Sequence, residues 1–271
     1  MELAARTGAW SKSGSPTPAY GGLCFTAEAD NSSVQLTAVG SAPTVTLVKS
    51  FDGVNWEAYA VGEVIDLPSV GDFVYLAAGE GGNNTFGSSS SAFHQFVING
   101  LVAASGDITS IRRFDLEQTT LATNCYISMF YGCTGLTSAP ELPATTLASH
   151  CYRNMFYGCT GLTNAPELPA TTLANYCYAS MFGGCKGLTS APELPATTLK
   201  TQCYAYMFEG CKNISIIKIH FTVWDLSALD GKTNGWVIGV ASIGTFYKPT
   251  ALPEEFGTNR IPTGWTVVNI D

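Results

Sequence analysis

A repeat of 26 residues dominates the middle of the sequence. Near-identical units begin at Thr119, Thr145 and Thr171, and a fourth unit, which begins at Thr197, keeps the first half of the pattern and loses the second. A short degenerate unit, SIRRFDLEQ, precedes them at Ser110. A unit of this length cannot bury its own apolar side chains, so successive units must stack and share one core.

Each unit carries an apolar stripe in a segment such as CYRNMFYGC. Cys151, Met155 and Cys159 follow one another at i, i+4 and i+8, and Phe156 lies beside them. This spacing predicts a short helix of about two turns with the stripe facing the core.

A turn and an extended segment are expected after this helix. The equivalents of Gly161 in the other units are Gly135, Gly187 and Asn213. Because Asn is the best substitute for Gly at positive φ, the exchange predicts a left-handed turn. The prolines around Glu167 then keep the chain extended. One short helix and one short strand in a unit of this length predict a leucine-rich-repeat solenoid.

The flanks of the repeat have a different character. Residues 21–107 hold about seven short stretches rich in β-branched and aromatic residues, with turn sequences such as FDGVNW and SVGD between them. They predict an antiparallel β-sandwich of immunoglobulin-like size. Residues 228–271 lack the 26-residue period and predict a cap in which Trp236 and Trp265 close the last apolar surface.

The predicted fold is therefore mainly β with short helices. It consists of an N-terminal arm over 1–20, an immunoglobulin-like sandwich over 21–107, a leucine-rich-repeat solenoid over 108–227 and a C-terminal cap over 228–271.

Charge and hydropathy exclude some partners. Charged residues make up only 13% of the chain and the net charge is −8, so we expect neither nucleic acid nor an anionic membrane surface as a partner. No apolar run approaches the roughly 18 residues of a membrane span. The N-terminal stretch has no basic start followed by an apolar segment, which predicts a protein made in the cytoplasm without a secretory signal.

The cysteines are the residues that most resemble a chemical site. Eight of the nine form C-x7-C pairs, which are Cys125 and Cys133, Cys151 and Cys159, Cys177 and Cys185, and Cys203 and Cys211. Stacked units would arrange them in two ladders in the narrow interior, where a small thiol packs well. We expect free, buried thiols of the structural core, with disulfides or a redox or metal ladder as alternatives, and no bound metal or cofactor.

Four acidic residues also recur in register, namely Asp115, Glu141, Glu167 and Glu193. Neighbouring turns of a solenoid lie roughly 5 Å apart, so these carboxylates would repel one another. Calcium bridging two turns would relieve the repulsion. The alternative that we favour is a solvated face or backbone capping by each Glu, and the sequence leaves the calcium question open.

Some positions vary between otherwise similar units, and they lie off the apolar stripe. They are Asn124/His150/Tyr176/Gln202, Ile127/Arg153/Ala179/Ala205, Ser128/Asn154/Ser180/Tyr206, Tyr131/Tyr157/Gly183/Glu209 and Thr134/Thr160/Lys186/Lys212. Exposed Tyr, His and Arg are typical contact residues. They predict a binding surface of His150, Arg153, Asn154, Tyr157, Tyr176, Tyr206, Lys186 and Lys212. The alternative is drift at positions without a packing constraint.

The residue pattern does not predict an enzyme. The histidines His94, His150 and His220 lie in separate segments, with no nucleophile motif around them. The Gly-rich stretch that begins at Gly79 lacks the lysine of a phosphate-binding loop and predicts a loop between strands.

The units from Thr119 to His220, with the patterns L-x-x-A-P-E-L-P and C-Y-x-x-M-F-x-G-C, closely resemble BspA-type leucine-rich repeats. The flanks CFTAEADNSSVQLT and IPTGWTVV resemble the segments that accompany such arrays. Repeats of this family are found on surface proteins of gut Bacteroidetes and in the phages that infect them. The resemblance implies a solenoid used for adhesion or display, with no catalytic residues to carry over.

These features together predict a non-enzymatic virion surface protein of a bacteriophage, such as a head fibre, capsid decoration or tail adhesin. The arm and the sandwich would contact capsid or tail proteins, and the solenoid would contact a host surface protein or glycan. Association with further copies of the chain is left open. The alternatives are a bacterial cell-surface adhesin and, as a third hypothesis, a glycan-active enzyme.

Overall fold

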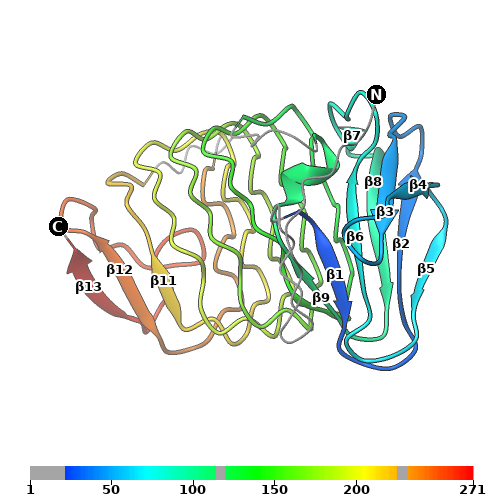
Figure 1. Ribbon diagram of the computed structural model, residues 1–271. Coiled ribbons are helices and arrows are strands. Elements are labelled where there is room, and N and C mark those ends of the chain that lie inside the picture. The colour runs from blue at the N-terminus through cyan, green and yellow to red at the C-terminus, as the bar shows by residue number, and fades with distance from the viewer. Residues whose placement is uncertain (1–21, 114–119, 225–230, 271) are drawn as a thin grey trace.

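The computed structural model describes residues 22–113, 120–224 and 231–270. Within these ranges the chain is mainly β, with several sheets and one helical element, the 3₁₀ helix η1 (Ile108–Ile111). Figure 1 shows strands gathered near the N-terminus, the repeat units side by side next to them, and further strands at the C-terminal end. The predicted arm over 1–20 and the predicted acidic residue Asp115 lie outside the described residues.

Two sheets form the N-terminal part of the molecule. The spatial order of the first sheet is β10 (Leu136–Ser138), β9 (Val102–Ser105), β1 (Cys24–Ala27), β6 (Phe73–Ala78), β3 (Leu47–Ser50) and β4 (Glu57–Tyr59). The order of the second is β5 (Val64–Leu67), β2 (Ser32–Val39), β8 (Ala92–Asn99) and β7 (Gly87–Ser89). All pairings are antiparallel except that of β9 with β10.

The alternating patterns of this region do form strands, as predicted. The described part of the region contains nine strands, β1 to β9, somewhat more than the roughly seven predicted. Inward residues alternate with outward ones along β8, where Phe96 and Ile98 are buried and Val97 is exposed. The two sheets meet through Phe25 and Phe96, whose ring centroids are 4.8 Å apart. The core therefore lies between the sheets.

The Gly-rich stretch predicted as a loop contains strand β7, which is a correction. Gly87 pairs with Phe93 of β8. A Cβ atom on Gly87 would lie 2.7 Å from the carbonyl oxygen of Asn124 and 2.5 Å from the Ile127 side chain. Because Gly87 has no side chain, this edge strand can lie close to the first repeat. The number of turn-forming residues in the sequence does not predict such a contact.

The N-terminal sheets and the repeats share one hydrophobic core. Strand β10 belongs to the first repeat and pairs in parallel with β9, with Leu136 opposite Val102. The ring of Phe130 in the first repeat stacks on Phe96, with centroids 5.1 Å apart. A single cluster of buried residues extends from Leu23 to Trp265. The first repeat is therefore covered by the preceding sheets.

The CYRNMFYGC segment is a series of turns and not the predicted helix. His150, Asn154 and Gly158 have φ angles of 59°, 56° and 74°, and the equivalent positions of the other described repeats are also left-handed. A left-handed residue at every fourth position is incompatible with a right-handed helix. The four-residue spacing of the apolar stripe therefore reflects successive turns, a period close to the 3.6 residues of a helix.

Backbone hydrogen bonds explain why this conformation is stable. The N–H groups alternate between two kinds of acceptor. Met155 donates to the Tyr152 carbonyl within the same unit, at 3.2 Å, whereas Tyr152 donates to Cys177 and Phe156 to Met181 in the next unit, at 3.0 and 2.9 Å. Every second N–H in the segment thus connects neighbouring repeats, so the turns depend on stacking.

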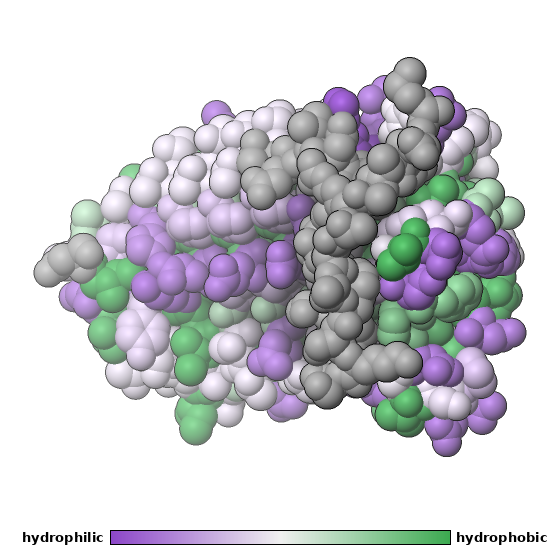
Figure 2. Space-filling view, viewed as in Figure 1, coloured by the Kyte–Doolittle hydropathy of each residue, from purple (hydrophilic) through white to green (hydrophobic). Residues whose placement is uncertain are grey.

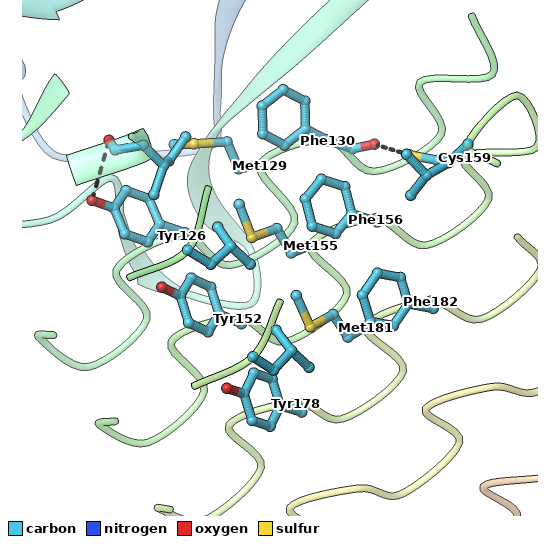
Figure 3. Packing of buried hydrophobic residues seen from close by; sticks show 14 of the residues in the cluster. Tyr126, Met129, Phe130, Tyr152, Met155, Phe156, Cys159, Tyr178, Met181 and Phe182 are labelled. Carbon is cyan, nitrogen blue, oxygen red and sulfur yellow. Dashed lines mark hydrogen bonds between the residues drawn. The ribbon is translucent and has the colours of Figure 1, made fainter. Parts of the chain in front are cut away.

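The interior of the repeats consists of columns of identical residues, which Figure 3 shows for tyrosine, methionine and phenylalanine. The ring centroids of Phe130 and Phe156 are 5.4 Å apart, and those of Tyr126 and Tyr152 are 5.8 Å apart. The predicted inward stripe of Cys151, Met155, Phe156 and Cys159 is confirmed, because all four side chains are fully buried.

Gly161 is required for a reason other than the predicted left-handed turn. It is not among the positive-φ residues, and that role belongs to Gly158. A Cβ on Gly161 would lie 2.6 Å from the carbonyl oxygen of Thr134 in the preceding repeat. Close approach of two backbones, and not φ, therefore selects glycine here.

The extended part of the units is less regular than predicted. It forms strand β10 in the first unit and strand β11 (Ile216–Lys218) in the fourth. The units between them contribute isolated bridges, such as the one between Thr146 and Thr172. Prolines remove N–H donors, which keeps these segments from forming continuous ladders.

At the C-terminal end, β11, β12 (Thr245–Pro249) and β13 (Thr266–Ile270) form a parallel sheet. The turn pattern continues into this region, since Gly239 is left-handed and packs over Gly210. Trp236 and Trp265 are buried, and their indole N–H groups donate to the carbonyls of Arg260 and Ala241, at 2.9 and 2.7 Å. No helical segment in the described ranges has the length and apolarity of a membrane span.

Candidate functional site

The residues predicted to bind a partner all come from the turn segments. They are together termed the turn face and comprise His150, Arg153, Asn154, Tyr157, Tyr176, Lys186, Tyr206 and Lys212. Lys186 and Lys212 are exposed, and the other side chains are half-buried. The backbone hydrogen bonds between adjacent units hold these segments in register, so equivalent side chains of neighbouring repeats stand beside one another.

Two rows of the variable positions have a left-handed backbone. His150, Tyr176 and Gln202 in one row have φ of 59°, 57° and 46°, and Asn154 and Tyr206 in the other have 56° and 54°. Large side chains are uncommon in this region of φ, where glycine is the default. The sequence offers no direct sign of this strain, because only Asn and His in these rows are residues enriched at positive φ.

Part of the predicted exposure is wrong. Ile127, Ala179 and Ala205 are buried, and only Arg153 of that row is partly exposed. Ser128 is buried as well. Strand β7 covers Ile127 in the first unit, because a Cβ on Gly87 would lie 2.5 Å from the Ile127 side chain. Variation in that row is therefore partly a packing effect.

Aromatic rings of the turn face stack in pairs that connect adjacent repeats. The rings of His150 and Tyr176 are 4.7 Å apart and nearly parallel, at 9°. Tyr157 stacks on the exposed Tyr131 at 5.2 Å and 7°. On its other side, Tyr157 covers Gly183, where an added Cβ would be 2.6 Å from the ring. Each ring thus has a defined orientation.

The charged side chains of the turn face, Arg153, Lys186 and Lys212, are all basic. Burial, and secondarily the Arg153 guanidinium, hold the pKa of His150 below its usual value, so the imidazole is neutral near pH 7. The Arg153 guanidinium has no hydrogen-bond or ion-pair partner among the described residues. An unpaired guanidinium beside stacked rings is suited to bind carboxylate or hydroxyl groups of a partner.

The acidic ladder lies on the extended segments, where Glu141, Glu167 and Glu193 are exposed. Figure 2 shows a hydrophilic band along the repeats on one face. The carboxylate of Glu193 is 3.0 Å from Lys218 and 2.5 Å from His220, and these two groups lower its pKa. Basic side chains of the chain itself thus neutralise this end of the ladder. No group of three or more potential ligands in the described part of the chain could hold a metal ion.

The thiols of the eight paired cysteines are buried and free, as predicted. Burial raises the pKa of Cys133 and Cys211 to about 12, and that of Cys125 and Cys203 to about 11. Such thiols are protonated at neutral pH and are poor nucleophiles. They contribute packing and, in the second cysteine of each unit, a hydrogen bond to a phenylalanine carbonyl, which belongs to β8 for Cys133 and to the preceding repeat for the other three.

The three histidines are in different environments. His220 pairs with Glu193, and His150 stacks on Tyr176. His94 is buried between the N-terminal sheets, and its Nδ1 is 3.1 Å from the carbonyl oxygen of Phe86. The sequence gives no signal for the surroundings of His94, because they are formed by strands distant along the chain.

The geometry defines a mainly β protein in which N-terminal sheets and stacked repeats share one core. Comparison with protein-family models, with curated proteins and with solved structures finds no match to this chain.

Proposed function

We propose that this chain is a non-enzymatic surface protein of a bacteriophage particle, such as a head fibre, capsid decoration or tail adhesin. In this proposal the stacked units form a leucine-rich-repeat solenoid, and the preceding two sheets form an immunoglobulin-like sandwich. The sandwich and the N-terminal arm contact capsid or tail proteins. The turn face contacts a protein or glycan on the host or on the gut surface.

The observation that carries the binding role is the left-handed backbone beneath the turn face. His150, Tyr176 and Tyr206 occupy positions where glycine would avoid a cost of about 1–2 kcal/mol. A third left-handed position in the same turn segment is occupied by glycine, Gly158. Retention of large polar and aromatic side chains at a conformational cost supports a role for the side chains themselves.

The regular scaffold supports the same role. Hydrogen bonds between successive turns hold the Arg153 and Tyr157 segments in fixed positions, so little ordering is required when a partner binds. Neighbouring repeats also present equivalent positions side by side, which suits a polymeric or repetitive partner.

Location is the first test. Purified phage particles should contain the chain by mass spectrometry, and antibody labelling should place it on the particle surface. Detection in the envelope of an uninfected bacterium, together with its absence from particles, would instead support the second candidate, a bacterial cell-surface adhesin.

Binding is the second test. Fluorescently labelled full-length chain is titrated onto intact bacterial cells and onto immobilised mucin. The double variant Arg153→Ala/Tyr157→Ala should weaken binding at least about tenfold, since both are expected contact residues. The control variant Asn164→Ala/Thr189→Ala changes exposed residues outside the turn face and should bind normally. Equal binding by both variants, or release of reducing sugars from mucin, would contradict the proposal.

A further inference from the structure

The space between the two N-terminal sheets opens to solvent at one end. Along β2, the side chains of Val34, Leu36 and Ala38 point to the same face, toward the core. Val34 and Leu36 are fully buried, whereas Ala38 is exposed. An inward-facing residue that is exposed marks the place where the opposite sheet no longer covers it.

A pocket of about 460 Å³ occupies this opening. Its lining comes from both sheets and from the segment before β3, and it includes Ala38, Pro43, Val45, Leu47, Tyr59 and His94. The lining is largely apolar, and the volume lies within the roughly 300–1,000 Å³ of pockets that hold small molecules. The pocket is separate from the turn face, which belongs to the repeats.

His94 presents one unused polar atom at this pocket. It lies directly opposite Ala38 in the β2–β8 pairing, so both side chains point to the same side of the sheet. Its Nδ1–H donates to the Phe86 carbonyl at 3.1 Å, which leaves Nε2 as an acceptor. Only 3% of the residue is exposed, and Nε2 has no hydrogen-bond partner among the described residues.

The other buried polar side chain of the lining is already satisfied. The Tyr59 hydroxyl donates to the Glu63 carbonyl at 2.9 Å and accepts from the Leu36 N–H at 2.7 Å. Burial keeps the pKa of His94 below its usual value, so the imidazole is neutral. Nε2 is not one of the fully buried atoms that lack a partner, so it is open to the pocket, where a ligand N–H or O–H can replace water as its donor.

We propose that this pocket binds a small, mostly apolar molecule that carries a single N–H or O–H group, and that this group donates a hydrogen bond to Nε2 of His94. The apolar walls bind the body of the molecule, and His94 selects for the donor. This inference is independent of the proposed function, since it concerns neither the turn face nor the particle.

Indole and 1-methylindole provide a matched pair of probes, because methylation removes the N–H and keeps the bicyclic shape. Each is titrated into the full chain while backbone amide resonances are followed by NMR. Indole should shift the resonances of Ala38, Tyr59 and His94 in a saturable manner. 1-Methylindole should bind about three- to tenfold more weakly, the value of one hydrogen bond.

Two tryptophan variants test the location. Ala38→Trp fills the pocket from an exposed position, and Val97→Trp places the same side chain on the outer face of β8, where Val97 is 37% exposed. Ala38→Trp should abolish indole binding, and Val97→Trp should leave it unchanged. His94→Phe should remove the preference for indole over 1-methylindole.

The proposal is overturned if indole does not bind saturably, if the two probes bind with equal affinity, or if both tryptophan variants bind indole alike. The tryptophan comparison decides the location even if the His94 variant does not fold.

Discussion

The thiol of Cys159 donates a hydrogen bond to the backbone carbonyl of Phe130 in the preceding repeat, with 3.0 Å between sulfur and oxygen. The same relationship occurs between Cys185 and Phe156 and between Cys211 and Phe182, and in the first repeat the thiol of Cys133 donates in the same way to Phe96 of strand β8. Each of these hydrogen bonds is buried. The second cysteine of the repeat is thus both a core residue and a connection to the chain segment stacked before it, which is the previous unit or, for the first repeat, strand β8.

Replacement of this thiol should destabilise the protein. Cys159→Ala removes the sulfur and its hydrogen bond, and we expect a loss of about 2 kcal/mol in the free energy of unfolding. The measurement is urea denaturation followed by circular dichroism. Thr160→Ala, at an exposed neighbour, should change the free energy by less than about 0.5 kcal/mol. A loss no larger than that of the control would show that the thiol contributes nothing.

Alkaline pH should unfold the protein. Burial raises the pKa of Cys125 and Cys203 from 9.0 to about 11, and that of Cys133 and Cys211 to about 12. A thiol whose pKa is raised on folding favours the folded state below pH 9, and this stability is lost as the pH rises toward 12. Circular dichroism between pH 7 and 12 should show a cooperative loss of structure above pH 9.

The eight paired cysteines should resist alkylation in the folded protein. Iodoacetamide at pH 8 should leave the folded protein unmodified at the eight paired cysteines, and mass spectrometry should detect full labelling after denaturation in urea. Rapid labelling of the folded chain at any of these cysteines would contradict their burial.

Two glycine substitutions should distinguish the free-energy cost of a steric clash between two backbones from the cost of a side chain at positive φ. Gly161→Ala places a methyl group 2.6 Å from the Thr134 carbonyl, and we expect a loss of about 3 kcal/mol. Gly132→Ala has open space around it and only a left-handed φ of 71°, so the loss should be about 1–2 kcal/mol. Denaturant midpoints of the two variants give the comparison, and an equal effect would refute the close-approach explanation.

Removal of one buried hydroxyl should stabilise the fold. The hydroxyl of Tyr178 is fully buried and has no hydrogen-bond partner, and Tyr152 and Tyr204 share this situation. Tyr178→Phe keeps the ring in its column and should raise the free energy of unfolding by about 1 kcal/mol. Tyr126→Phe should change it little, because the hydroxyl of Tyr126 has a weak bond of 3.5 Å to the Ile108 carbonyl. A lower melting temperature for Tyr178→Phe would show that this hydroxyl is satisfied in solution.

Much of the core could be predicted from the sequence. Repetition every 26 residues requires stacking, and the apolar stripe of Cys151, Met155 and Phe156 points to the interior in any conformation that stacks. Alternation of apolar and polar residues along β2 and β8 likewise predicts strands, since one face of each must be buried. These conclusions depend only on the spacing of apolar residues along the chain, which is a local property of the sequence.

The conformation of the turn segment was decided by tertiary structure. A spacing of four residues fits both a helix and a series of turns, and the choice depends on whether the N–H of Tyr152 finds an acceptor within its own unit or in the next. The burial of Ala179 and the surroundings of His94 also depend on chain segments far away in sequence. Local pattern therefore determines which residues face inward, whereas hydrogen bonds and contacts between neighbouring chain segments decide the backbone conformation and the surfaces that remain open.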